Sequence, residues 1–219
     1  MKIHKAGFRI ILITFLVFLA LLALIHFVFQ QYNYVQYLLY TADVAWLFFI
    51  IRFFRYPNRN LEENSNAVYA PADGKIVVLE EVQENKYLNE NRIQISIFMS
   101  VMNVHVNFYP ISGKIILYDY YAGDKMVAWH PKSSELNEHA VVVLEDKQNR
   151  KLLVKQIAGA LARRIVCKAK QGENAKQGEE LGMIKFGSRV DVLLPTNARL
   201  NVKMNEKVRA KKTVLAYFE

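Results

Sequence analysis

An unbroken apolar run near the N-terminus constrains this chain more than any other feature. Residues 8–29 are almost entirely apolar, and from Ile10 onward the only strongly polar side chain is His26. At about 1.5 Å per helical residue, a run of this length spans a bilayer core of about 30 Å. A cleaved secretory signal is the alternative, but no small-residue cleavage site follows the run. We therefore expect a membrane-spanning helix.

A second apolar stretch follows at residues 34–54 and is weaker than the first. Gln36, Thr41 and Asp43 interrupt it, and its most apolar part is residues 44–51. Because ionisable and amide groups are costly in the bilayer core, both a full crossing and a shallow or re-entrant segment are compatible with this composition. We expect the two segments to form an N-terminal hydrophobic helical hairpin.

Basic residues flank the hairpin and indicate its orientation. The connection at residues 30–33 carries no charge. Lysine and arginine near the ends of membrane helices favour the cytoplasmic side, so we expect both ends of the hairpin at the cytoplasmic face of the cell (inner) membrane. The formal net charge of +9 favours anionic lipid over nucleic acid as a partner. The flanking basic residues are Lys2, Lys5, Arg9, Arg52, Arg55 and Arg59.

The rest of the chain reads as β structure. We expect a membrane anchor at residues 1–56, a polar linker at 57–66 and a β-rich domain at 67–219. Many short strands without long amphipathic helices predict a mainly β fold, a compact barrel or sandwich, with one short helix around 158–164. The expected strands are 74–82, 94–99, 104–109, 113–118, 140–144, 151–157, 165–168, 189–193 and 214–217.

The dipeptide Gly187-Ser188 carries the most specific chemical hypothesis. Glycine lets the backbone reach strained conformations, and a serine hydroxyl can attack the preceding carbonyl, so an N→O acyl shift would convert the amide into a cleavable ester. Elimination from that ester leaves a pyruvoyl group. Taken alone, Gly-Ser is also a common turn dipeptide.

Four stretches of the chain support the cleavage hypothesis together. Their order and spacing resemble phosphatidylserine decarboxylase in its short proenzyme form. The resemblance covers nearly the whole chain, including residues 53–59 and 137–139, and the joint match is specific although each piece alone is not. The four stretches are residues 70–76, 98–107, 156–160 and 186–188.

The resemblance implies a carboxy-lyase that converts phosphatidylserine to phosphatidylethanolamine and CO2. It implies self-cleavage between Gly187 and Ser188, giving a large β chain, residues 1–187, and a small α chain, residues 188–219, which form a heterodimer within a possible higher oligomer. The cofactor would be a covalent pyruvoyl group made from Ser188, which forms a Schiff base with the substrate amine and accepts the electrons released by the carboxylate. No metal and no nucleic acid are implied.

Two further residues are the candidates for proton transfer. The Ser188 hydroxyl needs a base, and a base held by a carboxylate keeps its orientation, which points to His105 and Asp73. Taken alone, a structural histidine and a turn aspartate would explain both residues. Longer bacterial relatives carry a second histidine where this chain has Phe108. His105 must therefore serve both self-cleavage and decarboxylation, or His130 or His139 contributes.

Two other classes of function compete with this interpretation. A noncatalytic, membrane-tethered β-barrel of the lipoyl or phosphotransferase type would share the 71–75 pattern and would make Gly187-Ser188 a turn. No lysine occupies an obvious carrier hairpin, which counts against lipoylation. A membrane-anchored zinc hydrolase is weaker still, because the histidines lack the close pairing of a catalytic zinc site and Cys167 is the only cysteine.

Overall fold

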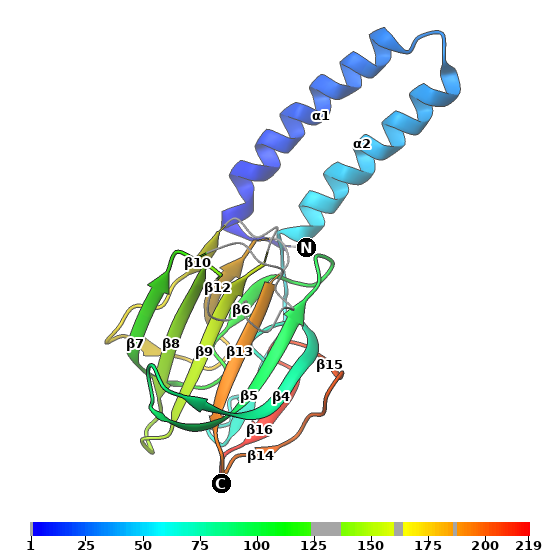
Figure 1. The fold of residues 1–219 in the computed structure, drawn as a ribbon. Helices are drawn as coiled ribbons and strands as arrows, with labels where there is room; N and C mark the ends of the chain where they lie inside the picture. Colours follow the sequence, from blue (N-terminus) through cyan, green and yellow to red (C-terminus); the bar gives the residue numbers. More distant parts are fainter. Residues whose placement is uncertain (1, 124–136, 160–163, 186–187) are drawn as a thin grey trace. The chain divides into compact units, whose positions relative to one another are not determined.

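The computed structural model describes residues 2–123, 137–159, 164–185 and 188–219 (Figure 1). The chain divides into two compact units, residues 1–58 and 59–219. The first unit is helical and the second is made of β-strands.

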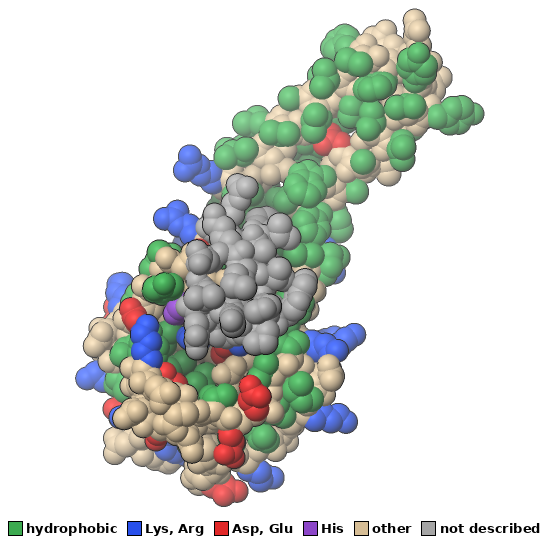
Figure 2. All heavy atoms as spheres, in the orientation of Figure 1, with side chains coloured by type: hydrophobic (Ala, Val, Ile, Leu, Met, Phe, Trp, Pro, Cys, Tyr) green, Lys and Arg blue, Asp and Glu red, His purple; other side chains and the backbone are tan. Residues whose placement is uncertain are grey.

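The first unit is an antiparallel helical hairpin. Helices α1 (Phe8–Val28) and α2 (Asn33–Phe53) are each long and apolar enough to cross a membrane by length and composition. Strands β1 (Lys2–Ile3) and β2 (Arg55–Tyr56) pair at the open end, beside a short 3-10 helix, η1 (Lys5–Gly7). Most of the hairpin's apolar side chains are exposed, as Figure 2 shows. This is the arrangement expected of helices that face lipid.

The second unit is built around a curled antiparallel sheet of eight strands, in the order β11-β7-β8-β9-β13-β5-β4-β15 (Figure 1). Register shifts in β4 between Ile76 and Val78, and in β7 between Ile115 and Leu117, mark bulges that bend the sheet. The strands are β4 (Gly74–Glu84), β5 (Glu90–Met99), β7 (Gly113–Tyr121), β8 (His139–Glu145), β9 (Lys151–Ala158), β11 (Asn174–Ala175), β13 (Ser188–Pro195) and β15 (Lys207–Val208).

Two three-stranded sheets complete this unit. The first has the order β10-β12-β6 and the second the order β14-β16-β3. Their strands are β3 (Ala67–Tyr69), β6 (Val106–Phe108), β10 (Ile165–Cys167), β12 (Glu180–Ile184), β14 (Arg199–Leu200) and β16 (Val214–Tyr217).

The core lies on the inner face of the curled sheet. Side chains alternate between the faces of a strand, so every second residue of β13 points inward. Val190, Val192 and Leu194 belong to one large buried cluster, which also contains Ile95 and Ile97 of β5. A smaller buried cluster lies on the outer face. Its members are Val141, Val143, Leu153 and Leu193.

The structure confirms the expected fold class, a mainly β domain preceded by a hydrophobic helical hairpin. The sequence patterns did not predict several short strands, among them β12, which pairs with β6. Gly182 interrupts the apolar run of β12, and its φ of 157° lies where glycine is favoured, so the alternation typical of a strand is weak. Ala158 ends β9 rather than starting a helix, and residues 160–163 of the expected helix lie outside the described residues.

Candidate functional site

The stretches singled out in the sequence meet at one end of the sheet. Ser188, the first residue of β13, pairs with Met99 at the end of β5 and with Ala158 at the end of β9. The backbone N–H of Phe108, in β6, donates to the carbonyl oxygen of Pro71 at 2.9 Å. The four stretches therefore lie on neighbouring strands, although Gly187 itself lies outside the described residues.

Ser188 is fully buried at this junction. Its side chain lies on the same strand face as Val190, which belongs to the core. The hydroxyl donates to the thioether sulfur of Met99, with Oγ and Sδ 3.4 Å apart. A serine in this place is held in one orientation and screened from water, as a reacting group requires.

Two buried amides are linked to the Met99 sulfur that Ser188 contacts. The Asn107 Nδ2 is 3.6 Å from the same Met99 sulfur, and the Gln156 Nε2 donates to the Asn107 Oδ1 at 2.7 Å. The Gln156 Oε1 has no hydrogen-bond partner among the described residues. A buried acceptor without a donor costs about 1–3 kcal/mol. Both residues lie at ends of stretches singled out in the sequence, 98–107 and 156–160, but sequence reasoning assigned neither side chain a role at the site.

His105 is fully buried immediately before β6. Its Nδ1 lies 3.0 Å from the carbonyl oxygen of Asn103, and its own carbonyl accepts from the N–H of Ile184 at 3.2 Å. Since a carbonyl oxygen can only accept, this contact favours the proton on Nδ1 and leaves Nε2 as the nitrogen that can take up a proton. The Asn103 side chain in turn accepts from the backbone and hydroxyl of Ser100, which fixes the turn before His105.

Asp73 forms a buried clamp rather than a contact within the sheet. Its two carboxylate oxygens accept from the Arg59 guanidinium at 2.5 and 2.7 Å, and the N–H of Ala210 donates to Oδ1 at 2.9 Å. The hydrogen bond to Asp73 raises the pKa of Arg59. These hydrogen bonds lead to Arg59 and Ala210 rather than to His105. They hold the turn before β4. Gly74, the first residue of β4, is required because a Cβ would collide with the carbonyl of Phe98.

His139 is placed less favourably than His105 for a role at Ser188. His139 pairs with Ile157, one residue from the Ala158–Ser188 pair, so its side chain lies on the opposite face of the sheet. His130 lies outside the described residues. Phe108, which stands where longer relatives have a second histidine, is buried with the Lys211 Nζ 5.1 Å from its ring centroid.

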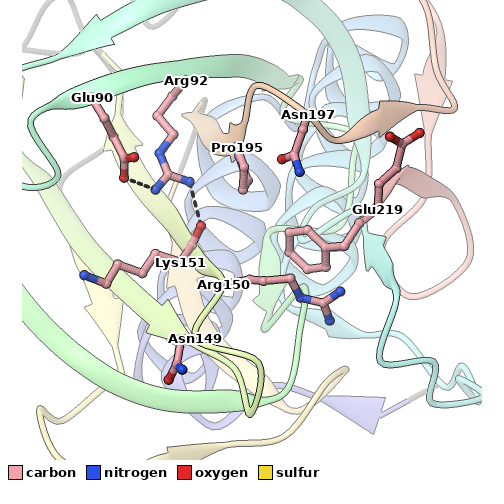
Figure 3. Close-up of a pocket in the computed structure, with 9 residues that line it drawn as sticks. Glu90, Arg92, Asn149, Arg150, Lys151, Pro195, Asn197 and Glu219 are labelled. Atoms are coloured by element: carbon pink, nitrogen blue, oxygen red, sulfur yellow. Dashed lines mark hydrogen bonds and ion pairs between the residues drawn. The ribbon is translucent and has the colours of Figure 1, made fainter.

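Two pockets of the β unit lie away from the Ser188 hydroxyl. One of about 610 Å³ lies on the outer face and contains the buried Arg189–Asp191 ion pair. Figure 3 shows another, of about 370 Å³, where Arg92 donates to the Lys151 carbonyl at 2.7 Å and pairs with Glu90. Pro195, which lines this second pocket, lies seven residues from Ser188 along β13, or about 24 Å at about 3.4 Å per residue.

Comparisons with known proteins agree with this arrangement. The family model for phosphatidylserine decarboxylase matches residues 46–216. The phosphatidylserine decarboxylase proenzyme of Cytophaga hutchinsonii is 44% identical over 218 residues, which cover 100% of this chain and 99% of the relative. The proenzyme of Porphyromonas gingivalis is 41% identical over 99% of this chain and 98% of its own length. That of Bacteroides thetaiotaomicron is 46% identical over 82% and 79%.

The β fold and these similarities define the class of the protein as a carboxy-lyase, an enzyme that removes CO2. The match covers most of the chain and includes all four stretches that meet at Ser188. The chain belongs to the phosphatidylserine decarboxylase family.

Acid should weaken the β unit through His139. Its Nδ1 lies 2.7 Å from the carbonyl oxygen of Asn137 and its ring stacks on Tyr121, while burial lowers its pKa from the ordinary value of 6.5. The unfolded chain therefore binds the proton first, so stability is complete above pH 6.5 and falls as the pH drops toward the lowered value.

Thermal unfolding of the full chain in detergent, followed by circular dichroism between pH 7.5 and 5, tests this pH dependence. His139→Phe keeps an aromatic ring but cannot titrate. We expect its melting temperature to depend less on pH than that of the wild type, by on the order of a few degrees over this range. Identical pH dependence in the two proteins would exclude His139 as the titrating group.

Proposed function

We propose that this chain is a proenzyme that cuts itself between Gly187 and Ser188 and then decarboxylates phosphatidylserine to phosphatidylethanolamine. The observation that carries the proposal is the position of Ser188. It is the first residue of a central strand, its hydroxyl is fully buried, and it lies where the four stretches meet. Relatives that match nearly the whole chain are named as proenzymes of this activity.

Self-cleavage needs only the serine, the preceding peptide group, a base and water. The Ser188 Oγ bonds to the Gly187 carbonyl carbon as the peptide C–N bond breaks; the hydroxyl proton passes to the base and a proton is delivered to the freed nitrogen. A base then removes the Cα proton of the resulting ester, which expels the Gly187 carboxylate. Water hydrolyses the enamine that is left, releasing ammonia and leaving a pyruvoyl group at the start of β13.

The surroundings of Ser188 fit such a group. Its neighbours on β5 and β9 are Met99 and Ala158, which leave the position dry and apolar, with the Asn107 amide as a nearby donor. A pyruvoyl carbonyl can bond to the substrate amine and accept the electron pair left by departing CO2. The chain's own residues exclude water, and we assign the transfer of protons to the His105 Nε2.

We assign Asp73 a positioning role. It ties Arg59 and Ala210 to the turn before β4, and the same turn accepts from β6 through the Pro71 carbonyl. Because His105 directly precedes β6, a displaced turn would displace the imidazole. Asp73 thus acts on the base through the backbone.

Strand pairing supports a stable heterodimer after cleavage. Residues 188–219 contain β13, which pairs with β5 and β9 on its two sides, and β15 and β16, which pair with β4 and β3. The small chain is therefore built into both large and small sheets and would stay in place without a covalent link. The helical hairpin supports anchoring at the cell membrane, and the basic residues that flank it favour the cytoplasmic face. A noncatalytic carrier module explains neither the family nor the buried serine.

Ser188→Ala should leave the chain uncut and inactive, because the alanine methyl group cannot replace the serine hydroxyl as the nucleophile. Intact-mass spectrometry of the wild type should give two fragments divided after Gly187, the smaller about 17 Da lighter than its serine-containing sequence because ammonia is lost. A single uncut mass from folded wild-type protein would refute self-cleavage.

Asp73→Ala should slow chain splitting by about tenfold, since small displacements of a reacting group are costly. Arg59→Ala is the matched variant: if Asp73 acts by clamping the turn, both variants split slowly in a time course after synthesis. Fast splitting of Arg59→Ala beside slow splitting of Asp73→Ala would show instead that the carboxylate acts on the base directly.

His105→Ala should lower decarboxylation by about 100-fold or more, because proton transfer loses its donor and acceptor. Release of labelled CO2 from carboxyl-labelled phosphatidylserine in mixed micelles measures this, with His139→Ala as a control on the other face of the sheet. Wild-type rates in His105→Ala would remove the imidazole from the mechanism.

A further inference from the structure

We propose that Met99, Asn107 and Gln156 are positioning residues for the Ser188 hydroxyl, and that they set the rate at which the chain cuts itself. This inference rests on the proposed self-cleavage and assigns the group that aims the nucleophile. The three residues come from three different strands, β5, β6 and β9, and each is fully buried.

The contacts form one continuous series that ends at the nucleophile. The Ser188 Oγ and the Asn107 Nδ2 both lie against the Met99 sulfur, at 3.4 and 3.6 Å. The Gln156 Nε2 holds the Asn107 Oδ1 at 2.7 Å, which sets the direction in which the Asn107 amide points. A change at Gln156 is therefore passed to Ser188 through two contacts.

A thioether suits the task of holding a nucleophile before it reacts. Sulfur is a weak acceptor, so it orients the hydroxyl without binding its proton strongly. The proton can pass to a base at little cost, and both oxygen lone pairs stay available for attack on the Gly187 carbonyl carbon. A carboxylate or amide oxygen in the place of the sulfur would hold the proton more tightly.

The amide pair is poorly explained by packing alone. The interior around it is apolar, with Val154, Ala158 and Val190 in the core cluster. The Gln156 Oε1 gains no hydrogen bond within the described residues in return for its burial. Two amides that served only each other could be replaced by apolar side chains of similar size with little effect. That substitution separates a positioning role from a structural one.

The first experiment compares Met99→Leu with Met183→Leu. Both methionines are fully buried, and no hydrogen bond to the Met183 sulfur occurs among the described contacts. Leucine keeps most of the volume and removes the sulfur. In a time course of splitting after cell-free synthesis with lipid vesicles, we expect Met99→Leu to split about tenfold to a hundredfold more slowly than wild type and Met183→Leu to split normally.

The second experiment uses the double variant Asn107→Leu/Gln156→Met. We expect a melting temperature close to that of the wild type and splitting slowed to a similar extent. Treatment with hydroxylamine, which cleaves esters but not amides, shows whether the ester has formed, and the unchanged melting temperature excludes a structural defect as the cause. If the hydroxyl is misplaced, the ester does not form, so the uncut Met99→Leu and double-variant chains should resist hydroxylamine.

The outcomes separate this inference from the proposed function. Wild type that stays uncut refutes self-cleavage itself. If the wild type splits and Met99→Leu splits equally fast, self-cleavage stands and the positioning role alone is refuted. A variant that splits slowly but is readily cut by hydroxylamine also refutes the positioning role, because its ester would then form normally. Should the double variant fail to fold, the comparison of Met99→Leu with Met183→Leu decides.

Discussion

The pairing of β13 on both sides is the constraint on which the rest of the structure depends. Ser188 is the first residue of this strand, and its backbone is registered against Met99 on β5 and Ala158 on β9. A one-residue slip would turn Ser188 to the outer face and Arg189 into the core. The buried apolar residues of β13 prevent that slip, so the packing of the core also fixes the placement of Ser188, the proposed nucleophile.

The same pairing is compatible with the self-cleavage that we propose. A cut at the start of a central strand would remove one covalent bond but leave the ladder hydrogen bonds to β5 and β9 in place. Interstrand hydrogen bonds and the shared core would then hold the two pieces together. The Asp73–Arg59 clamp and its bond to Ala210 add a tie between the beginning of the β unit and its C-terminal part.

Two polar side chains are buried in an otherwise apolar part of the core. Asn107 and Gln156 lie among apolar side chains, and burying them is unfavourable unless they are hydrogen-bonded. Sequence patterns predicted the strands that carry Asn107 and Gln156 and the strand that directly follows Ser188, because short runs of branched and aromatic residues between turn signals indicate strands. They could not reveal that Gln156 and Asn107 meet, since residues 49 positions apart in the chain are joined only by folding.

The sequence by itself determined the hydrophobic hairpin and the β-rich domain, and it singled out Ser188, His105 and Asp73 as candidates, because apolar length, alternation and ordered motifs are local properties. Only the tertiary structure decided what these residues touch. It pairs the Asp73 carboxylate with the Arg59 guanidinium and places the His105 Nδ1 beside the Asn103 carbonyl oxygen. It also places His139 on the opposite face of the sheet from Ser188. The physical reason is that hydrogen-bond partners and sheet faces depend on register between strands, which pairs residues far apart in the chain.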